Sequence, residues 1–174
     1  MKRRDFLRLA PLGAAPPATA QSAGTSRARL PVRSIETFRH RQAIFVKVTA
    51  ENGLAGSGEA ASNNTRLMET FIQHGLKEHV IGQNAFDAEP IWDRMFFENH
   101  DLGPGGALTN AIAGIDLALW DLKGRYLGLP VHALIGGAYR DRIKVYGSFG
   151  VGFGRRMTPE QAAAKARKFV AKGY

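Results

Sequence analysis

The chain has 174 residues, with 24 Lys and Arg against 15 Asp and Glu and no cysteine. That length fits one medium-sized domain, or a small domain with part of a second. The lack of cysteine excludes disulfides, thiol nucleophiles and cysteine-ligated metal centres. No apolar run approaches the roughly 18 residues that cross a bilayer, so we expect no membrane anchor. The basic residues form no aromatic-interleaved stripe, so we expect no nucleic-acid partner.

The first twenty residues have the pattern of an export signal. A basic start is followed by a short, weakly apolar stretch, and residues 18–20 (ATA) match an A-x-A cleavage site. Residues 3–7 (RRDFL) resemble the twin-arginine export signal. We therefore expect a twin-arginine signal peptide over 1–20, a linker over 21–31, and a periplasmic or otherwise exported protein. The alternative is an ordinary basic tail.

Three short segments next predict an antiparallel meander. Residues 33–38 give a first strand, and residues 44–50 (IFVKVTA) alternate β-branched and aromatic side chains as strands do. Asn52 and Gly53 then supply the conformations of a tight hairpin turn. Residues 54–59 return as a third strand, whose glycines allow a close approach of another backbone.

The hydrophobic period then changes to that of helices. Apolar residues at three- and four-residue spacing predict a helix that starts with Thr65 as its N-cap and continues to about Val80. Asp87 is placed to cap a second helix. A long third helix is predicted over 107–127, and Gly128 is placed to end it. Strands and helices together predict an α+β domain.

A different unit begins near residue 142. Residues 143–148 predict a short strand, and residues 149–156 form a glycine-rich loop. Residues 158–161 (TPEQ) then combine an N-cap, a proline at the first helical position and a capping-box glutamine, which predicts a helix over 159–172. One strand cannot form a sheet alone, so the pattern is that of an unfinished βα repeat.

Residues 105–137, GGALTNAIAGIDLALWDLKGRYLGLPVHALIGG, resemble the enolase superfamily, in its mandelate racemase and muconate lactonizing enzyme branch. Residues 45–60 (FVKVTAENGLAGSGEA) are similar to the second and third strands of that branch. Residues 89–96 (EPIWDRMF) are similar to its second capping helix, and residues 140–148 (RDRIKVYGS) to its entry into a barrel.

The resemblance implies an α+β capping domain over 32–137, with a three-stranded antiparallel meander plus helices. It further implies that 138–174 is the first βα unit of a truncated (β/α) barrel. The family removes a proton α to a carboxylate, with Lys or His as base and Mg²⁺ to stabilise the enediolate. The family's base and metal ligands correspond to positions beyond Tyr174. We therefore expect no catalytic residue and no metal ligand in this chain, which should be inactive alone.

Within the stretch 105–137, residues 105–124 (GGALTNAIAGIDLALWDLKG) resemble galactonate dehydratases, as does the short link at 39–43 between the first two strands. This implies a Mg²⁺-dependent lyase acting on a sugar acid, a small-molecule partner. One alternative is a racemase or cycloisomerase of the same family. Another is a non-catalytic exported capping module used for association. Members of the family commonly assemble through these domains, so the resemblance also implies a homo-oligomer.

Three residues are candidates for substrate specificity. In the resembling enzymes the loop after the third strand helps to select the substrate, and here that loop is 60–65 (AASNNT). Its Asn63 and Asn64 carry donors and acceptors suited to sugar hydroxyls, whereas the alternative is that they cap the next helix. His100, next to Asp101, lacks the further ligands that a metal site needs, so we expect a turn there, with His100 a candidate pocket residue.

Two polar residues of the long helix are further candidates for a structural or catalytic role. Asp116 and Trp120 are four positions apart and therefore lie on one helix face. A buried aspartate needs a hydrogen-bonding partner, and such a pair is more often structural than catalytic. The resemblance assigns Asp116 no role in catalysis.

Overall fold

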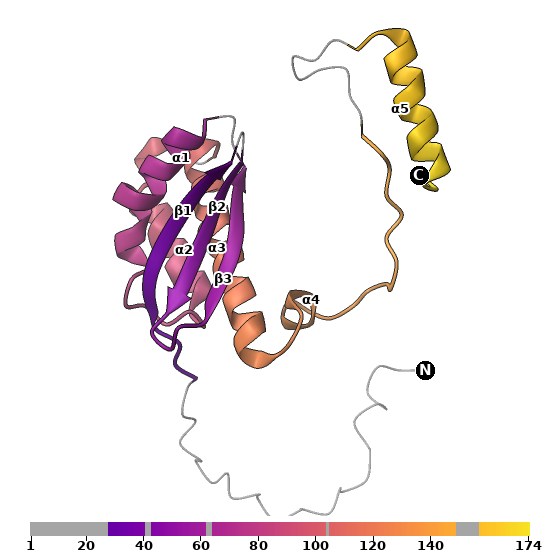
Figure 1. Ribbon diagram of the computed structural model, residues 1–174. Coiled ribbons are helices and arrows are strands. Elements are labelled where there is room, and N and C mark those ends of the chain that lie inside the picture. Colours follow the sequence, from indigo (N-terminus) through magenta and orange to yellow (C-terminus); the bar gives the residue numbers. More distant parts are fainter. Residues whose placement is uncertain (1–27, 41–42, 62–63, 104, 149–156) are drawn as a thin grey trace, which may run out of the picture.

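The computed structural model describes residues 28–40, 43–61, 64–103, 105–148 and 157–174. Its strands are β1 (Val32–His40), β2 (Ala43–Ala50) and β3 (Ala55–Ala61). Its helical elements are α1 (Thr65–Phe71), η2 (Ile72–Leu76), η3 (Lys77–His79), α2 (Ala88–Phe97), η4 (His100–Leu102), α3 (Ala107–Leu127), α4 (Val131–Leu134) and α5 (Pro159–Ala171). Figure 1 shows the sheet on one side of the molecule with α1, α2 and α3 behind it.

The sheet is the predicted antiparallel meander. Its strand order is β1-β2-β3, and both neighbouring pairs are antiparallel. The hairpin between β2 and β3 is closed by a hydrogen bond from the Ala50 amide to the Leu54 carbonyl at 2.8 Å. Gly53 has a φ of 87°, which a residue with a side chain rarely adopts. The three-stranded prediction is confirmed, with ends that differ by one or two residues.

Strand β3 lies unusually close to helix α3. A Cβ atom on Gly56 would overlap the carbonyl oxygen of Ala118, and one on Gly58 would overlap the carbonyl oxygen of Gly114. The side-chain carboxylate of Asp121 on α3 also accepts a hydrogen bond of 2.8 Å from the backbone amide of Ser57. The predicted close approach is confirmed at these glycines, and α3 is fixed along the edge of the sheet.

The hydrophobic core lies between the inner face of the sheet and the helices. Alternate residues of the strands point into it because successive strand side chains face opposite sides of a sheet. The fully or almost fully buried strand residues are Val32, Ile35, Ile44, Val46, Val48, Ala50 and Ala60. The buried helical residues opposite them include Met68, Ile72, Leu76, Ile91, Met95, Leu108, Ile112, Ile115, Leu119 and Leu122.

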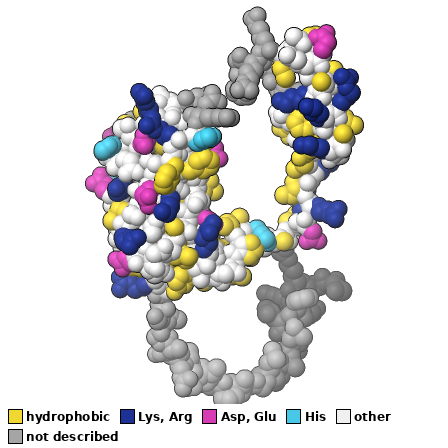
Figure 2. All heavy atoms as spheres, viewed as in Figure 1, with side chains coloured by type: hydrophobic (Ala, Val, Ile, Leu, Met, Phe, Trp, Pro, Cys, Tyr) yellow, Lys and Arg dark blue, Asp and Glu magenta, His cyan; other side chains and the backbone are white. Residues whose placement is uncertain are grey.

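Among the residues that the structure describes, no helix covers the outer face of the sheet. Phe38 and Phe45 are direct cross-strand partners there, and they are 50% and 41% exposed. Beside them, the Lys47 ammonium contacts the Glu36 carboxylate at 3.2 Å. Figure 2 shows hydrophobic side chains on this face with charged side chains of both signs around them.

The first helical region differs from the prediction in two ways. Its N-cap is Asn64 rather than Thr65, because the Asn64 side chain accepts a hydrogen bond of 3.1 Å from the Leu67 amide. The region is also not one helix, since α1 is followed by the π-helical η2 and the 3₁₀-helical η3. Within α1, Met68 is buried, whereas Leu67, which the predicted apolar face included, is 42% exposed.

Helix α3 has the predicted length and end. Gly128 takes the left-handed conformation, with a φ of 66°, and the Leu129 amide donates to the Gly124 carbonyl at 2.9 Å. This is the glycine-terminated helix end that the sequence predicts. In the part of the chain that the structure describes, neither α3 nor any other helix is long and apolar enough to cross a membrane.

The strand predicted at 143–148 is wrong: the structure gives these residues no regular secondary structure, and the barrel-like start is not confirmed. Strand hydrogen bonds require a neighbouring strand, and no other strand lies beside this segment in the described residues. Helix α5 does form, with its capping box: the Gln161 amide donates to the Thr158 hydroxyl at 3.3 Å, and the Thr158 amide donates to the Gln161 side chain at 3.0 Å. The glycine-rich loop over 149–156 lies outside the described residues.

Candidate functional site

The short link at 39–43 and the loop predicted to select substrate, at 60–65, both join the same end of the sheet. His40 at the end of β1 pairs with Ala43 at the start of β2, and Ala43 pairs with Ala61 at the end of β3. These three residues therefore form one row across the sheet. Residues 41–42 and 62–63 connect to this row and lie outside the described residues, so Asn63 is among those whose position is not described.

Asn64 begins α1, just beyond this row. Its side-chain oxygen accepts the Leu67 amide, so its interpretation as a helix cap is confirmed. Its side chain lies in an exposed position. The cap uses the side-chain oxygen, and the other group of an asparagine side chain is an NH₂ donor of the kind that binds hydroxyls. A role in substrate selection for Asn63 and Asn64 stays a prediction.

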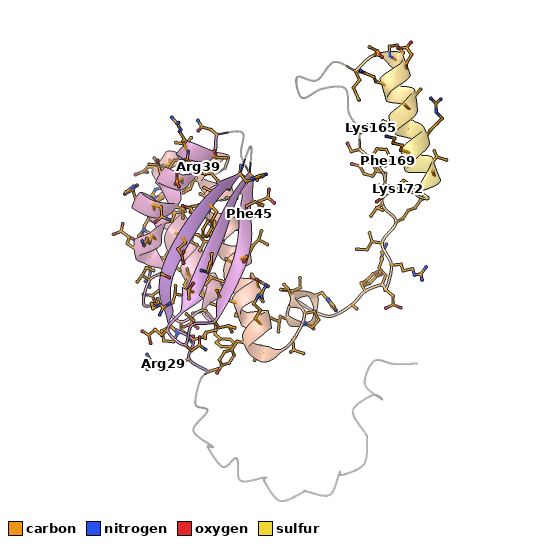
Figure 3. All side chains as sticks on the ribbon, in the orientation of Figure 1. Arg29, Arg39, Phe45, Lys165, Phe169 and Lys172 are labelled. Carbon is orange, nitrogen blue, oxygen red and sulfur yellow. The ribbon has the colours of Figure 1, made fainter. Side chains whose placement is uncertain are left out.

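A polar network ties α1 to β1 near this end of the sheet. The Arg39 guanidinium contacts the Glu69 carboxylate at 3.0 Å, and the Thr37 hydroxyl donates to the other Glu69 oxygen at 3.2 Å. The Gln73 side chain donates in turn to the Thr37 hydroxyl at 3.2 Å. Figure 3 shows Arg39 at the end of the sheet where α1 begins. This network fixes the helix that carries Asn64.

Arg39 and His40 are additional polar residues at this end of the sheet. The sequence pattern singles out neither of them, because a charged residue at the end of a strand is usually only a solvated one. The strand register does identify them, since a meander whose first strand ends at residue 40 places that end beside the loop after the third strand. The two exposed side chains offer guanidinium and imidazole donors to an acidic or polyhydroxylated ligand.

His100 lies in η4, the turn after α2. Its Nδ1 is 2.6 Å from the Phe97 carbonyl oxygen, and its Nε2 is 3.1 Å from an Asp101 carboxylate oxygen. The neighbouring Asn99 side chain donates to the Met95 carbonyl at 3.0 Å and so satisfies the end of α2. The predicted turn is confirmed. His100 and Asn64 thus lie on separate elements, and a pocket role for His100 stays a prediction.

Among the residues that the structure describes, no three His, Cys, Asp or Glu side chains are grouped so that they could hold a metal ion. Besides the Glu69 carboxylate, which already pairs with Arg39 and Thr37, the side chains described at the sheet end are an amide, a guanidinium and an imidazole, whereas Mg²⁺ prefers carboxylate oxygens in near-octahedral geometry. These residues do not fit a magnesium site, and we assign none to them. What they can do chemically is donate hydrogen bonds to a ligand.

The other polar group singled out by the sequence, Asp116 and Trp120, lies between α2 and α3. Asp116 is half-buried and not fully buried. Burial raises the pKa of Asp116 and the nearby Glu89 carboxylate raises it further, although the Lys123 charge and the Trp120 side chain oppose the shift. Burial likewise lowers the pKa of Lys123, while the Asp116 and Glu89 charges oppose that shift. A hydrogen-bonding partner for Asp116 stays a prediction.

The amino-acid sequence of this chain is similar to the sequences of known dehydratases. A D-mannonate dehydratase of Caulobacter vibrioides is 37% identical over 141 residues, which is 80% of this chain and 34% of that protein. A D-galactonate dehydratase of Variovorax paradoxus is 41% identical over 104 residues, which is 59% of this chain and 27% of that protein. The chain thus spans about a third of the length of these relatives.

A solved racemase from Streptomyces coelicolor with bound magnesium superposes with a TM-score of 0.73 at 28% identity, covering 82% of this chain and 44% of that one. Residues 19–136 match the family model described as the mandelate racemase/muconate lactonizing enzyme N-terminal domain. The match includes the whole meander and helices α1 to α4. The chain therefore belongs to the mandelate racemase/muconate lactonizing enzyme family of the enolase superfamily, and it carries that family's N-terminal domain.

Proposed function

We propose that this chain is the N-terminal capping part of a sugar-acid dehydratase. The observation that carries the proposal is its 37% to 41% identity with D-mannonate and D-galactonate dehydratases over most of the described fold. Because the chain spans only about a third of those proteins, the activity is that of a longer protein that includes it.

In the proposed reaction, the proton on the carbon next to the carboxylate is removed. The electron pair of that C–H bond forms a carbon–carbon double bond as the hydroxyl on the following carbon leaves with a proton as water. The resulting enol tautomerises to a 2-keto-3-deoxy acid, so the reaction is a dehydration without any net oxidation. Mg²⁺, which the family uses, supplies positive charge to the carboxylate as negative charge develops on it.

The proposed part of this chain in that reaction is recognition rather than catalysis. The row at the end of the sheet presents Arg39 and His40, and α1 presents Asn64 beside it. These groups are suited to the hydroxyls or the far end of a sugar acid, and we keep Asn63 and His100 as further candidates. Polar contacts that discriminate between hydroxyl configurations contribute strongly to specificity, because a mismatch leaves a polar group without its partner.

A racemase or cycloisomerase of the same family is the second candidate function. The observation in its favour is the solved racemase, whose superposition extends over 82% of this chain. Racemisation begins with loss of the same α-proton but returns a proton to the carbon and loses no water. The product therefore distinguishes the two proposals.

The test is made with the longer reading frame that contains this chain. The purified protein is incubated with Mg²⁺ and D-galactonate, D-mannonate and their epimers, and the products are followed by NMR. We expect metal-dependent formation of a 2-keto-3-deoxy acid. Epimerisation without loss of water would contradict the dehydratase proposal and favour a racemase, and no reaction with any acid would favour a non-catalytic association module.

Two controls sharpen this test. The 174-residue chain alone, in D₂O with Mg²⁺ and the same acids, should give no α-proton exchange above buffer, because no three acidic or histidine side chains of the described residues are grouped as metal ligands and we propose that the base belongs to the rest of the longer protein. Asn64→Asp keeps the oxygen that caps α1 but removes the amide donors. In the longer protein this variant should change the ratio of kcat/KM values between substrates.

We also propose that the protein is exported through the twin-arginine route. The support is the RRDFL sequence at 3–7 and the ATA sequence at 18–20, which lie outside the described residues. Replacing Arg3 and Arg4 with lysine should retain the uncleaved precursor in the cytoplasm. Processing and fractionation identical to the native protein would contradict the proposal.

A further inference from the structure

A small surface cavity lies between α2 and α3, away from the end of the sheet. Its volume is about 260 Å³, and it is lined by Glu89, Trp92 and Asp93 from α2 and by Asp116 and Trp120 from α3. The α2 residues are spaced by three and four and the α3 residues by four, so each helix turns one face toward the cavity. The chain has two tryptophans, and both line it.

The cavity is acidic although the chain as a whole carries a net charge of +9. Among the described residues, the salt bridges involve none of its three carboxylates. Burial is the main cause of the raised pKa of Asp116, whereas the Lys123 charge and the Trp120 side chain each lower it by more than the repulsion from Glu89 raises it. A further positive charge in the cavity would relieve that repulsion.

The structure already shows a cation on one of the cavity walls. The Lys123 Nζ lies 3.2 Å from the centroid of the Trp120 ring, and Lys123 is only 5% exposed. An indole face attracts cations because of its quadrupole. The other wall, Trp92, is held by stacking on Phe96, with 5.0 Å between the ring centroids and 15° between the planes. Packing therefore holds the side chains of Trp92 and Trp120 in place without a ligand.

The lining selects an organic cation over a metal ion. No three acidic or histidine side chains among the described residues are grouped as metal ligands, so the carboxylates around this cavity do not converge on one point. A guanidinium group is planar, weakly hydrated and rich in N–H donors, so it stacks on indole rings and donates to several carboxylates at once. We infer that the cavity between Trp92 and Trp120 binds a guanidinium group, from an arginine side chain or a small alkylguanidine.

Intrinsic fluorescence tests this directly, since both tryptophans report on the cavity. The 174-residue chain is titrated at constant ionic strength with three probes: agmatine, acetyl-Gly-Arg-Gly-amide, and the same peptide with neutral citrulline in place of arginine. We expect a saturable fluorescence change with the arginine peptide and none with the citrulline peptide. Agmatine binding as well as the peptide indicates a small-molecule site, and peptide binding alone indicates a protein side chain. Equal responses to arginine and citrulline peptides, or no response to any probe, would overturn the inference.

Two variants locate the binding. Glu89→Gln changes an exposed lining residue and should weaken binding of the arginine peptide about tenfold, as should Asp116→Asn. Glu51→Gln, in the exposed β2–β3 turn, is the matched control and should bind like the native chain. Circular dichroism confirms that each variant is folded. Native affinity in both cavity variants would place the binding elsewhere and overturn the inference. This inference does not depend on the proposed dehydratase activity.

Discussion

Residues 28–137 and residues 138–174 differ in what their apolar side chains contact. In the first region Ile112 and Leu119 are fully buried between sheet and helices. In the second, Ile143 is 75% exposed and Tyr146 is 86% exposed. In Figure 1, residues 138–148 form an extended segment and α5 is a single helix, and neither has the layered packing of the first region.

The comparison separates local from non-local determinants of structure. Helix α5 forms because its hydrogen bonds and its Thr158 cap lie within the segment itself. Residues 143–148 have strand-like side chains but no strand to pair with, so their sequence preference alone does not produce a strand. In contrast, β1, β2 and β3 are consecutive, so that each strand finds its partner across a short turn.

The largest expected difference comes from removing side-chain volume in each region. Leu119→Ala leaves a cavity in the core and should lower the free energy of unfolding by about 2–5 kcal/mol. Val170→Ala, at a position that is 71% exposed on α5, should change it by less than about 0.5 kcal/mol. Urea unfolding measures both variants. Equal losses would contradict the distinction between the two regions.

Adding a methyl group at the contact between β3 and α3 should have the next largest effect. Gly58→Ala brings its Cβ against the Gly114 carbonyl, which is backbone and cannot move without shifting α3. We expect a loss of about 1–3 kcal/mol in unfolding free energy by urea titration. Gly105→Ala is the control, because nothing lies within 4 Å of its added Cβ and its φ is not positive. A tolerated Gly58→Ala would show that this contact is looser than described.

Removing the cap of α5 should have a smaller effect, confined to its own region. Thr158→Ala deletes the hydroxyl that accepts the Gln161 amide and should destabilise the helix by about 1 kcal/mol. NMR chemical shifts of α5 should move toward coil values, while the urea midpoint of the core stays unchanged. A shifted midpoint would indicate that the two regions unfold together.

The smallest expected effect is a pH dependence of the unfolding free energy of the first region, caused by Asp116. The folded-state pKa of Asp116 lies above its ordinary value of 3.8. At pH values between these two pKa values, the folded chain therefore binds more protons than the unfolded chain. The native stability contributed by this group therefore falls as pH rises from about 3.8 through the folded-state pKa. Relative to the native chain, Asp116→Asn should become more stable across this rise in pH, measured by urea unfolding at several pH values.

The sequence predicts the parts of the fold whose signals are local. The hairpin at Asn52 and Gly53, the end of α3 at Gly128 and the capping box at Thr158 each occupy a few adjacent residues, and all three are confirmed. The division of the first helix into α1, η2 and η3 was not predicted, because apolar spacing does not distinguish a helix from one with a π-helical turn. The prediction of a strand at 143–148 was wrong because a strand forms only by pairing with another strand, whose residues lie far away in the sequence.

The residues of the candidate site also divide into those that the local sequence predicts and those that only the fold brings together. The two roles weighed for Asn64 include the cap that the structure shows, because capping is a local property. Arg39 and His40 join the site only through the register of the sheet. The cavity between Trp92 and Trp120 depends on how α2 packs against α3, and their spacing along the chain does not reveal it.

Hydrogen–deuterium exchange of the 174-residue chain is the most direct test of the difference between the two regions. Amides of β2 and α3 should be strongly protected and should open together, because they surround one core. Amides of residues 143–148 should exchange at nearly the rates of an unstructured peptide, since the structure gives them no strand partner. Protection at 143–148 comparable to that of β2 would contradict the account, because it would require a strand pairing that the structure does not contain.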